Sequence, residues 1–165
     1  MTKIFVFAEN TSTLLKICFG THKLGDRIEA VVIDEIGAGF ADKIWIIPFK
    51  YGADLVDYTE SIAALIKKEK PNTFLMESTK NCMLIAERLA TLLGSRVSIE
   101  SLNIEHERVL KHFVDRSKEE QIKKKDTVTT ILMVSDRAFQ EAELEKRNGE
   151  VETIKFIVPA VELSS

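Results

Sequence analysis

Short apolar runs alternate along the chain with longer segments that have one apolar face. The run from Ile44 to Ile47 is continuous, a pattern typical of a strand buried on both faces of a parallel sheet. The next segment, Ala53 to Lys70, has apolar residues at spacings of three and four, which predicts a helix with one face packed on that sheet. Pro71 ends this helix, because proline has no N–H to donate and pushes the residue before it out of the helical region.

The same alternation continues on both sides of this unit and predicts the fold class. Right-handed crossovers between such strands and helices give a parallel sheet with helices on both faces. We therefore expect a single α/β domain over residues 1–165, with three α/β/α layers and a mostly parallel sheet. The expected strands are Lys3–Ala8, Arg27–Ile33, Lys43–Phe49, Thr73–Glu77, Val97–Glu105, Thr127–Ser135 and Val151–Val158. The expected helices are a segment capped by Asn10, Thr11 or Ser12 that ends before Gly25, and the segments Ala53–Lys70, Asn81–Leu93 and Phe139–Lys146.

Five segments carry a family resemblance. They are KIFVFAE at residues 3–9, ADKIWII at 41–47, KPNTFLMEST at 70–79, LIAERLATLLG at 84–94 and VTTILMVSDRAF at 128–139. In this order they resemble the N-terminal domain of the alpha subunit of electron-transfer flavoproteins, and Ala86 to Ala90 is the most specific piece. The resemblance implies an adenine-nucleotide-alpha-hydrolase-like fold and a role in electron transfer.

The resemblance also indicates what this chain lacks. The family's alpha subunit has a C-terminal domain that holds most of the FAD, and this chain stops at Ser165, where that domain would begin. Cys82-Met83 stand where the family usually has a glycine and a basic residue, which allow close approach to a ligand and contact with a phosphate. We therefore expect FAD by family resemblance only, not held tightly by this chain. Electron transfer would then require a beta-like subunit or another chain that supplies the flavin domain.

The segment from Glu107 to Asp126 permits two interpretations. Its apolar residues between Val109 and Ile122 fit the periodicity of a helix. The family resemblance instead implies a β-hairpin with arms at Arg108–Val114 and Gln121–Lys125. We adopt the hairpin as the prediction.

Composition places the chain among ordinary globular domains. It is 45% hydrophobic and 30% charged, and its net charge of −3 argues against general nucleic-acid binding, which needs a basic excess. No apolar run approaches the roughly 20 residues that cross a bilayer, so we expect no membrane partner. The first apolar run is too short for a signal peptide. Cys18 and Cys82 lack a CxxC partner, and we interpret them as buried, reduced cysteines of a cytoplasmic protein.

Residues at the expected carboxyl edge of the sheet are the candidate ligand site. Ligands of open parallel sheets prefer this edge, where helix N-termini offer unpaired N–H groups. If a nucleotide such as AMP binds, we expect its neighbours to be Ala8, Glu9, Ile33, Gly37, Gly39, Ser78 and Thr79. Gly37-x-Gly39 lacks the third glycine of a dinucleotide fingerprint and is also explained as a tight turn, and Ser78 or Thr79 is also explained as a helix cap.

Residues suited to catalysis are sparse. The segment Glu9–Thr11 stands where nucleotide-cleaving proteins of this broad fold have a glycine-rich loop, so we do not expect ATP hydrolysis. On a hairpin arm, His106 and His112 would stand about 20 Å apart at ~3.3 Å per residue, which is too far for one metal ion. Arg88 lies within an apolar helix and should pair with a carboxylate. No set of nucleophile, base and acid can be assembled, so we do not expect an enzyme.

The leading interpretation is an electron-transfer-flavoprotein alpha-related protein that works with a partner. A small adenine-nucleotide-binding module and a non-catalytic assembly protein remain open as alternatives. We also expect a two-fold homodimer, because the predicted arms between Val97 and Lys125 would leave unpaired strand edges with complementary charges.

Overall fold

A computed structural model of the chain describes residues 2–24, 27–34, 39–123, 128–139, 147 and 149–159. Within these residues seven strands form one sheet in the order β5-β6-β4-β1-β2-β3-β7, and every neighbouring pair is parallel. The strands are β1 (Lys3–Phe7), β2 (Arg27–Ile33), β3 (Lys43–Ile47), β4 (Thr73–Glu77), β5 (Val97–Ile104), β6 (Thr129–Val134) and β7 (Glu150–Thr153). The predicted parallel sheet is confirmed.

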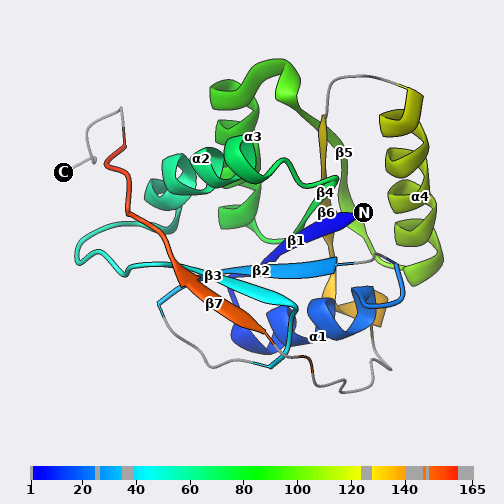
Figure 1. The fold of residues 1–165 in the computed structure, drawn as a ribbon, viewed down its shortest axis with the longest axis horizontal. Coiled ribbons are helices and arrows are strands. Elements are labelled where there is room, and N and C mark those ends of the chain that lie inside the picture. Colours follow the sequence, from blue (N-terminus) through cyan, green and yellow to red (C-terminus); the bar gives the residue numbers. More distant parts are fainter. Residues whose placement is uncertain are drawn as a thin grey trace.

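Helices cover both faces of this sheet and make the three predicted layers (Figure 1). Residues of α2 and α3 belong to the core on one face, and residues of α1 and α4 to the core on the other. The α-helices are α1 (Thr11–Thr21), α2 (Thr59–Glu69), α3 (Lys80–Leu93) and α4 (Glu107–Lys123). The described residues also form three short 3-10 helices, η1 (Leu55–Tyr58), η2 (Gly94–Arg96) and η3 (Asp136–Phe139).

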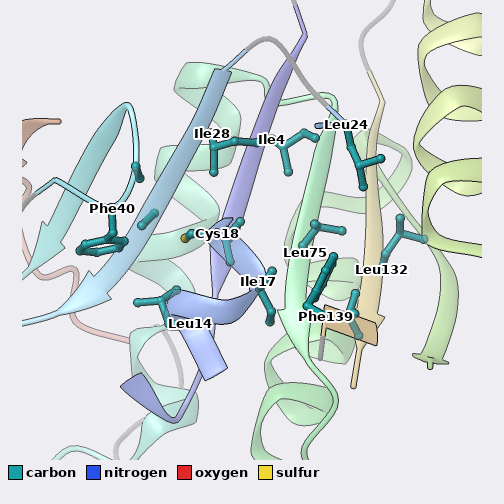
Figure 2. Packing of buried hydrophobic residues seen from close by; sticks show 14 of the residues in the cluster. Ile4, Leu14, Ile17, Cys18, Leu24, Ile28, Phe40, Leu75, Leu132 and Phe139 are labelled. Atoms are coloured by element: carbon teal, nitrogen blue, oxygen red, sulfur yellow. The ribbon is translucent and has the colours of Figure 1, made fainter. Parts of the chain in front are cut away.

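Alternate residues of each strand supply two hydrophobic cores, one on each face of the sheet. In β1, Ile4 and Val6 belong to the core beneath α1, whereas Phe5 and Phe7 belong to the core beneath α2 and α3. Figure 2 shows the first core, in which Ile17 of α1 lies over the strands. Because both faces of a strand are buried, neither face needs polar residues, and the strands read as continuous apolar runs.

Most element boundaries agree with the sequence. Strands β2 and β4 have the predicted bounds, and the segment predicted as one helix from Ala53 contains η1 followed by α2. Lys70 ends α2 in the left-handed conformation, with φ of 49°, and its N–H donates to the Ile66 carbonyl at 2.8 Å. Most of the helix predicted at Phe139–Lys146 lies outside the described residues.

The last strand is shorter than predicted, because β7 ends at Thr153 and not at Val158. The Ile154 N–H still donates to the Ile46 carbonyl of β3 at 2.8 Å, and after it the chain leaves the sheet and crosses towards α2 (Figure 1). The Ile157 N–H donates to Ser61 Oγ at 2.8 Å, and the Phe156 ring packs edge-on against Tyr58 with 5.3 Å between the ring centroids. The segment around Phe156 and Ile157 therefore contacts η1 and α2 and does not extend β7.

The predicted hairpin between Glu107 and Asp126 is wrong, because this segment forms the helix α4. Leu110 and Val114 are fully buried one helical turn apart and fix the inner face of the helix. The outer face carries charged side chains, with Lys111 paired to Asp115 at the i,i+4 spacing. Both features are local, and both favour the helix that periodicity alone predicted. The separation inferred for His106 and His112 assumed that both lie on a strand, so that inference no longer applies.

Candidate functional site

The strand order reverses at β1, with β2 on one side of it and β4 on the other. In open parallel sheets such a switch point, at the carboxyl ends of the strands, is where ligands bind. A cavity of about 250 Å³ lies at this edge, between the ends of β1 and β2 and the connection from β3 to η1. Its lining residues are Phe7, Ala8, Glu9, Thr11, Leu14, Val32, Ile33, Phe49, Ala53, Leu55 and Tyr58.

Three of the residues predicted for the site meet in this cavity, namely Ala8, Glu9 and Ile33. Ser78 and Thr79 lie at the same edge but have other contacts. Thr79 Oγ1 accepts a hydrogen bond from the Cys82 N–H at 3.1 Å, which is the contact of a helix cap for α3. The Ser78 hydroxyl donates to the Leu102 carbonyl at 2.9 Å and so ties this turn to β5.

Gly39 does not lie with the other predicted site residues. The Gly39 carbonyl accepts the Arg147 N–H at 2.9 Å. A Cβ added to Gly149, the residue before β7, would lie 3.6 Å from the Gly39 backbone nitrogen. Gly39 therefore belongs to the opposite, amino-terminal edge, because the connection from β2 to β3 must return there before β3 starts. The other predicted glycine, Gly37, lies outside the described residues.

The sequence did not predict a contact that crosses the switch point, made by Glu77 at the end of β4. One oxygen of its carboxylate, Oε1, accepts the backbone N–H of Glu9 at 3.0 Å and that of Asn10 at 3.1 Å. The other oxygen, Oε2, accepts Asn10 Nδ2 at 3.0 Å. The Glu77 side chain is only 7% exposed. A carboxylate that ends an otherwise apolar strand was the only signal for this contact in the sequence.

A second hydrogen bond closes the same edge, since Asn81 Nδ2 of α3 donates to Glu9 Oε1 at 2.6 Å. Asn10, one of the three residues predicted as possible caps, is the N-cap of α1, but its side chain makes no capping hydrogen bond and donates to Glu77 instead. The turn after β1 is therefore fastened to the end of β4 and to the start of α3. This network holds the switch point together.

We tested whether the residues at this edge fit FAD, the cofactor implied by the family. A pyrophosphate at a switch point needs free N–H donors next to a helix N-terminus. The Glu77 carboxylate already takes the N–H groups of Glu9 and Asn10. The cavity of about 250 Å³ is also smaller than ordinary small-molecule sites, which span about 300–1,000 Å³. The two N–H groups already taken and the small volume disfavour FAD at this edge.

A larger cavity, of about 460 Å³, lies at the amino-terminal edge of the sheet. Ile66 and Leu93 give it an apolar floor, and Lys67, Lys70 and Arg96 stand around it. These cations lie at the carboxyl ends of α2 and α3, where the helix dipole favours a positive charge. Their positions are therefore explained without a bound ligand. The cavity is away from the switch point.

Metal and membrane sites are not found in the described part of the chain. Those residues contain no group of three or more His, Cys, Asp or Glu placed to hold a metal ion. None of the described helices is both long enough and apolar enough to cross a membrane.

The fold is a parallel α/β domain with helices on both faces of the sheet, and at its switch point the Glu77 carboxylate accepts the N–H groups of the turn after β1. The model of the electron transfer flavoprotein domain matches residues 24–159, which is most of the chain. The chain therefore belongs to the electron transfer flavoprotein domain family, and the resemblance found in the sequence is confirmed.

Curated relatives agree with this family. Protein FixB of Salmonella typhimurium, of Salmonella typhi and of Salmonella paratyphi A is in each case 21% identical to the chain over 170 residues. The aligned region covers 96% of this chain and 54% of each relative. The chain thus spans about half the length of the curated relatives it matches.

Proposed function

We propose that this protein is an alpha-type electron-transfer-flavoprotein domain that takes part in electron transfer only together with a partner that supplies the flavin domain. The observation that carries the proposal is the family match over residues 24–159. Partner dependence is supported by the switch point, where Glu77 takes the donors that a flavin pyrophosphate would need. The partner is a beta-like subunit or a separate flavin-domain protein.

Cofactor content tests this proposal. The tagged chain is purified from its native host under conditions that keep complexes intact, and also on its own after expression without its partners. We expect the chain alone to release no stoichiometric FAD on denaturation, whereas the native complex absorbs in the visible region as a flavoprotein and bleaches on reduction. Stoichiometric FAD in the isolated chain, or a native complex without flavin, would contradict the proposal.

An adenine-nucleotide-binding module is the second candidate, and the cavity lined by Ala8, Glu9 and Ile33 favours it. Backbone groups at Ile33 would form hydrogen bonds with the edge of an adenine ring. Calorimetric titration with AMP and with adenosine tests it. The Ala53→Trp variant should fill the cavity and abolish binding, whereas Ser95→Trp, at an exposed position of the opposite edge, should not. Absence of heat with both ligands at about millimolar concentration (weak binding by any standard) would exclude this function.

Self-association also remains a proposal, with β5 as the surface. This strand is an outer edge of the sheet, so one side of it leaves backbone groups open for another strand. The hairpin arms that motivated the expectation are absent, and two register shifts in the pairing of β5 with β6 make the edge less regular. Light scattering behind size exclusion decides the matter: a mass of one chain, 18.7 kDa, across a range of salt would exclude the homodimer.

The proposed compartment is the cytoplasm. Cys18 and Cys82 are both free and buried, which suits a reducing environment. Fractionation of the native cells with an antibody to the chain tests this, and recovery outside the cytoplasmic fraction would contradict it.

A further inference from the structure

Three hydrogen-bond donors converge on one point beside the start of α1. They are the N–H groups of Glu9 and Asn10 and the side-chain amide of Asn10, at 3.0, 3.1 and 3.0 Å from the Glu77 carboxylate. Convergent backbone N–H groups at the start of a helix are the usual way in which such folds hold an anion. Here the anion is present, and it is the protein's own side chain.

The place of this carboxylate in the sheet makes the contact informative. Met76 of β4 pairs with Phe7 of β1, so Glu77 follows directly beside Ala8, at the carboxyl edge where the strand order reverses. Ala8 and Glu9 also line the cavity of about 250 Å³. A phosphate of a ligand in this cavity would therefore lie next to the Glu9 N–H, which Glu77 already takes, and Asn10 follows directly in the chain.

The charge around the site points the same way. Among the described residues, no Lys, Arg or His forms an ion pair with Glu9 or Glu77. The Asn81 amide that binds Glu9 is uncharged. A ligand phosphate would therefore meet two carboxylates, the exposed Glu9 and the buried Glu77, without a cation among those residues to offset them. Repulsion from Glu77 is the stronger, because its burial reduces screening by water.

We propose that Glu77 is a specificity-determining residue, a built-in anion that takes the phosphate position of the switch point and excludes phosphate-bearing groups from it. The site then accepts only groups that are uncharged or cationic where they meet the turn after β1. This inference goes beyond the proposed electron-transfer role and does not depend on it. It conflicts with the second candidate function where a nucleotide phosphate would meet this turn, so of the two ligands titrated there it favours adenosine over AMP.

A purely structural role for Glu77 also predicts that its loss destabilises the fold, so stability alone does not separate the two roles. The two roles differ in whether the three donors bind another anion once the Glu77 carboxylate has been removed. If the three donors form an anion site, Glu77→Ala creates a site for a free oxyanion, and that anion restores the stability lost with the side chain. A side chain that only fills space cannot be replaced by an anion in this way.

The experiment measures the thermal unfolding of wild type and of Glu77→Ala in inorganic phosphate and in acetate, at ionic strength held constant with chloride. We expect saturable stabilisation of the variant, with Tm raised by about 3–6 °C at roughly ten times the dissociation constant, and no such effect on wild type. Isothermal titration with phosphate should show one site in the variant and none in wild type.

Two further variants serve as controls. Glu77→Gln keeps the volume of the side chain in place, so phosphate should have no effect on it. The double variant Glu77→Ala with Asn10→Ala lacks one of the three donors, so its phosphate affinity should fall by about tenfold, the loss expected for one hydrogen bond to a charged group.

The absence of saturable anion binding in folded Glu77→Ala would overturn the proposal, and so would wild type that binds phosphate as tightly as the variant. If Glu77→Ala does not fold in chloride, refolding is measured with and without phosphate, in parallel with Glu77→Gly, which leaves more room. Recovery of folding by phosphate in either variant supports the proposal, and failure in both overturns it.

Discussion

Arg88 of α3 and Glu60 of α2 form an ion pair that joins the two helices on one face of the sheet, with 2.5 Å between Arg88 Nε and Glu60 Oε1. The Glu60 side chain is 8% exposed and the Arg88 side chain 24%. The sequence predicted that Arg88 pairs with a carboxylate, and this is confirmed. Its partner was not predictable, because 28 residues separate the two in the chain.

Arg88→Ala should lower the free energy of unfolding by about 2–4 kcal/mol, because it leaves the Glu60 carboxylate buried without its cation. Urea denaturation measures the change. Lys111→Ala is the matched control, since the Lys111–Asp115 pair is 63% and 47% exposed and should contribute less than about 1 kcal/mol. Equal losses in the two variants would show that burial of the pair does not matter.

The sequence predicted those parts of the fold that local patterns encode. Continuous apolar runs marked β2 and β4 with the bounds that the structure has, and Lys70-Pro71 marked the end of α2. The one large error, in α4, came from preferring the family resemblance over a clear helical periodicity.

The candidate site was less predictable, because its contacts join distant segments. Ala8, Glu9 and Ile33 line one cavity because each follows or ends a strand at the same edge, which strand patterns could predict. Gly39 was misplaced because a short connection between parallel strands carries the chain from one edge to the other. Glu77 was missed because its partners lie 67 and 68 residues away along the chain.

Gly20→Ala should destabilise the protein by about 2–3 kcal/mol or more through overpacking. Gly20 lies in α1, and a Cβ at this position would overlap the ring of Phe139, which is itself buried against α1. Thermal unfolding monitored by circular dichroism measures the loss. Alanine is otherwise the better helix former, so without the contact the substitution would be stabilising.

Replacing Phe139 by the smaller leucine should relieve this clash. The double variant Gly20→Ala with Phe139→Leu is expected to lose less stability than the sum of the two single changes, which a double-mutant cycle measures. Strict additivity would mean that Gly20 and Phe139 do not meet in solution.

Glu29→Ala should cost about 2–4 kcal/mol and change the fluorescence of Trp45, the only tryptophan in the chain. The buried Glu29 carboxylate accepts Trp45 Nε1 at 2.6 Å and Arg27 Nε at 2.6 Å, so its loss leaves the indole N–H unpaired in the core. Urea unfolding and emission spectra are the measurements. As a control, Glu69→Ala removes a more exposed partner of Lys3 and should change neither quantity appreciably.

Alkaline pH should destabilise the protein through Cys82. The pKa of this thiol is raised to about 11 from an ordinary value of 9.0 in the unfolded chain, mainly by burial and in smaller part by the nearby Glu77 and Glu9 carboxylates. The folded state therefore retains its proton while the unfolded state loses one, so the stabilisation is complete below pH 9 and is lost as the pH rises towards 11. The loss amounts to at most about 3 kcal/mol for a shift of this size.

Urea unfolding of wild type and of Cys82→Ala, carried out between pH 7 and pH 11, tests the assignment, with the two pH limits bracketing the shift. We expect the variant to be less stable at neutral pH, because it leaves a small cavity, but to lose less stability across the alkaline range. Cys18 is present in both proteins, and burial raises the pKa of its thiol even more strongly. It therefore accounts for the pH dependence of stability that remains in the variant. Identical slopes in the two proteins would mean that the Cys82 thiol does not remain protonated in the folded state.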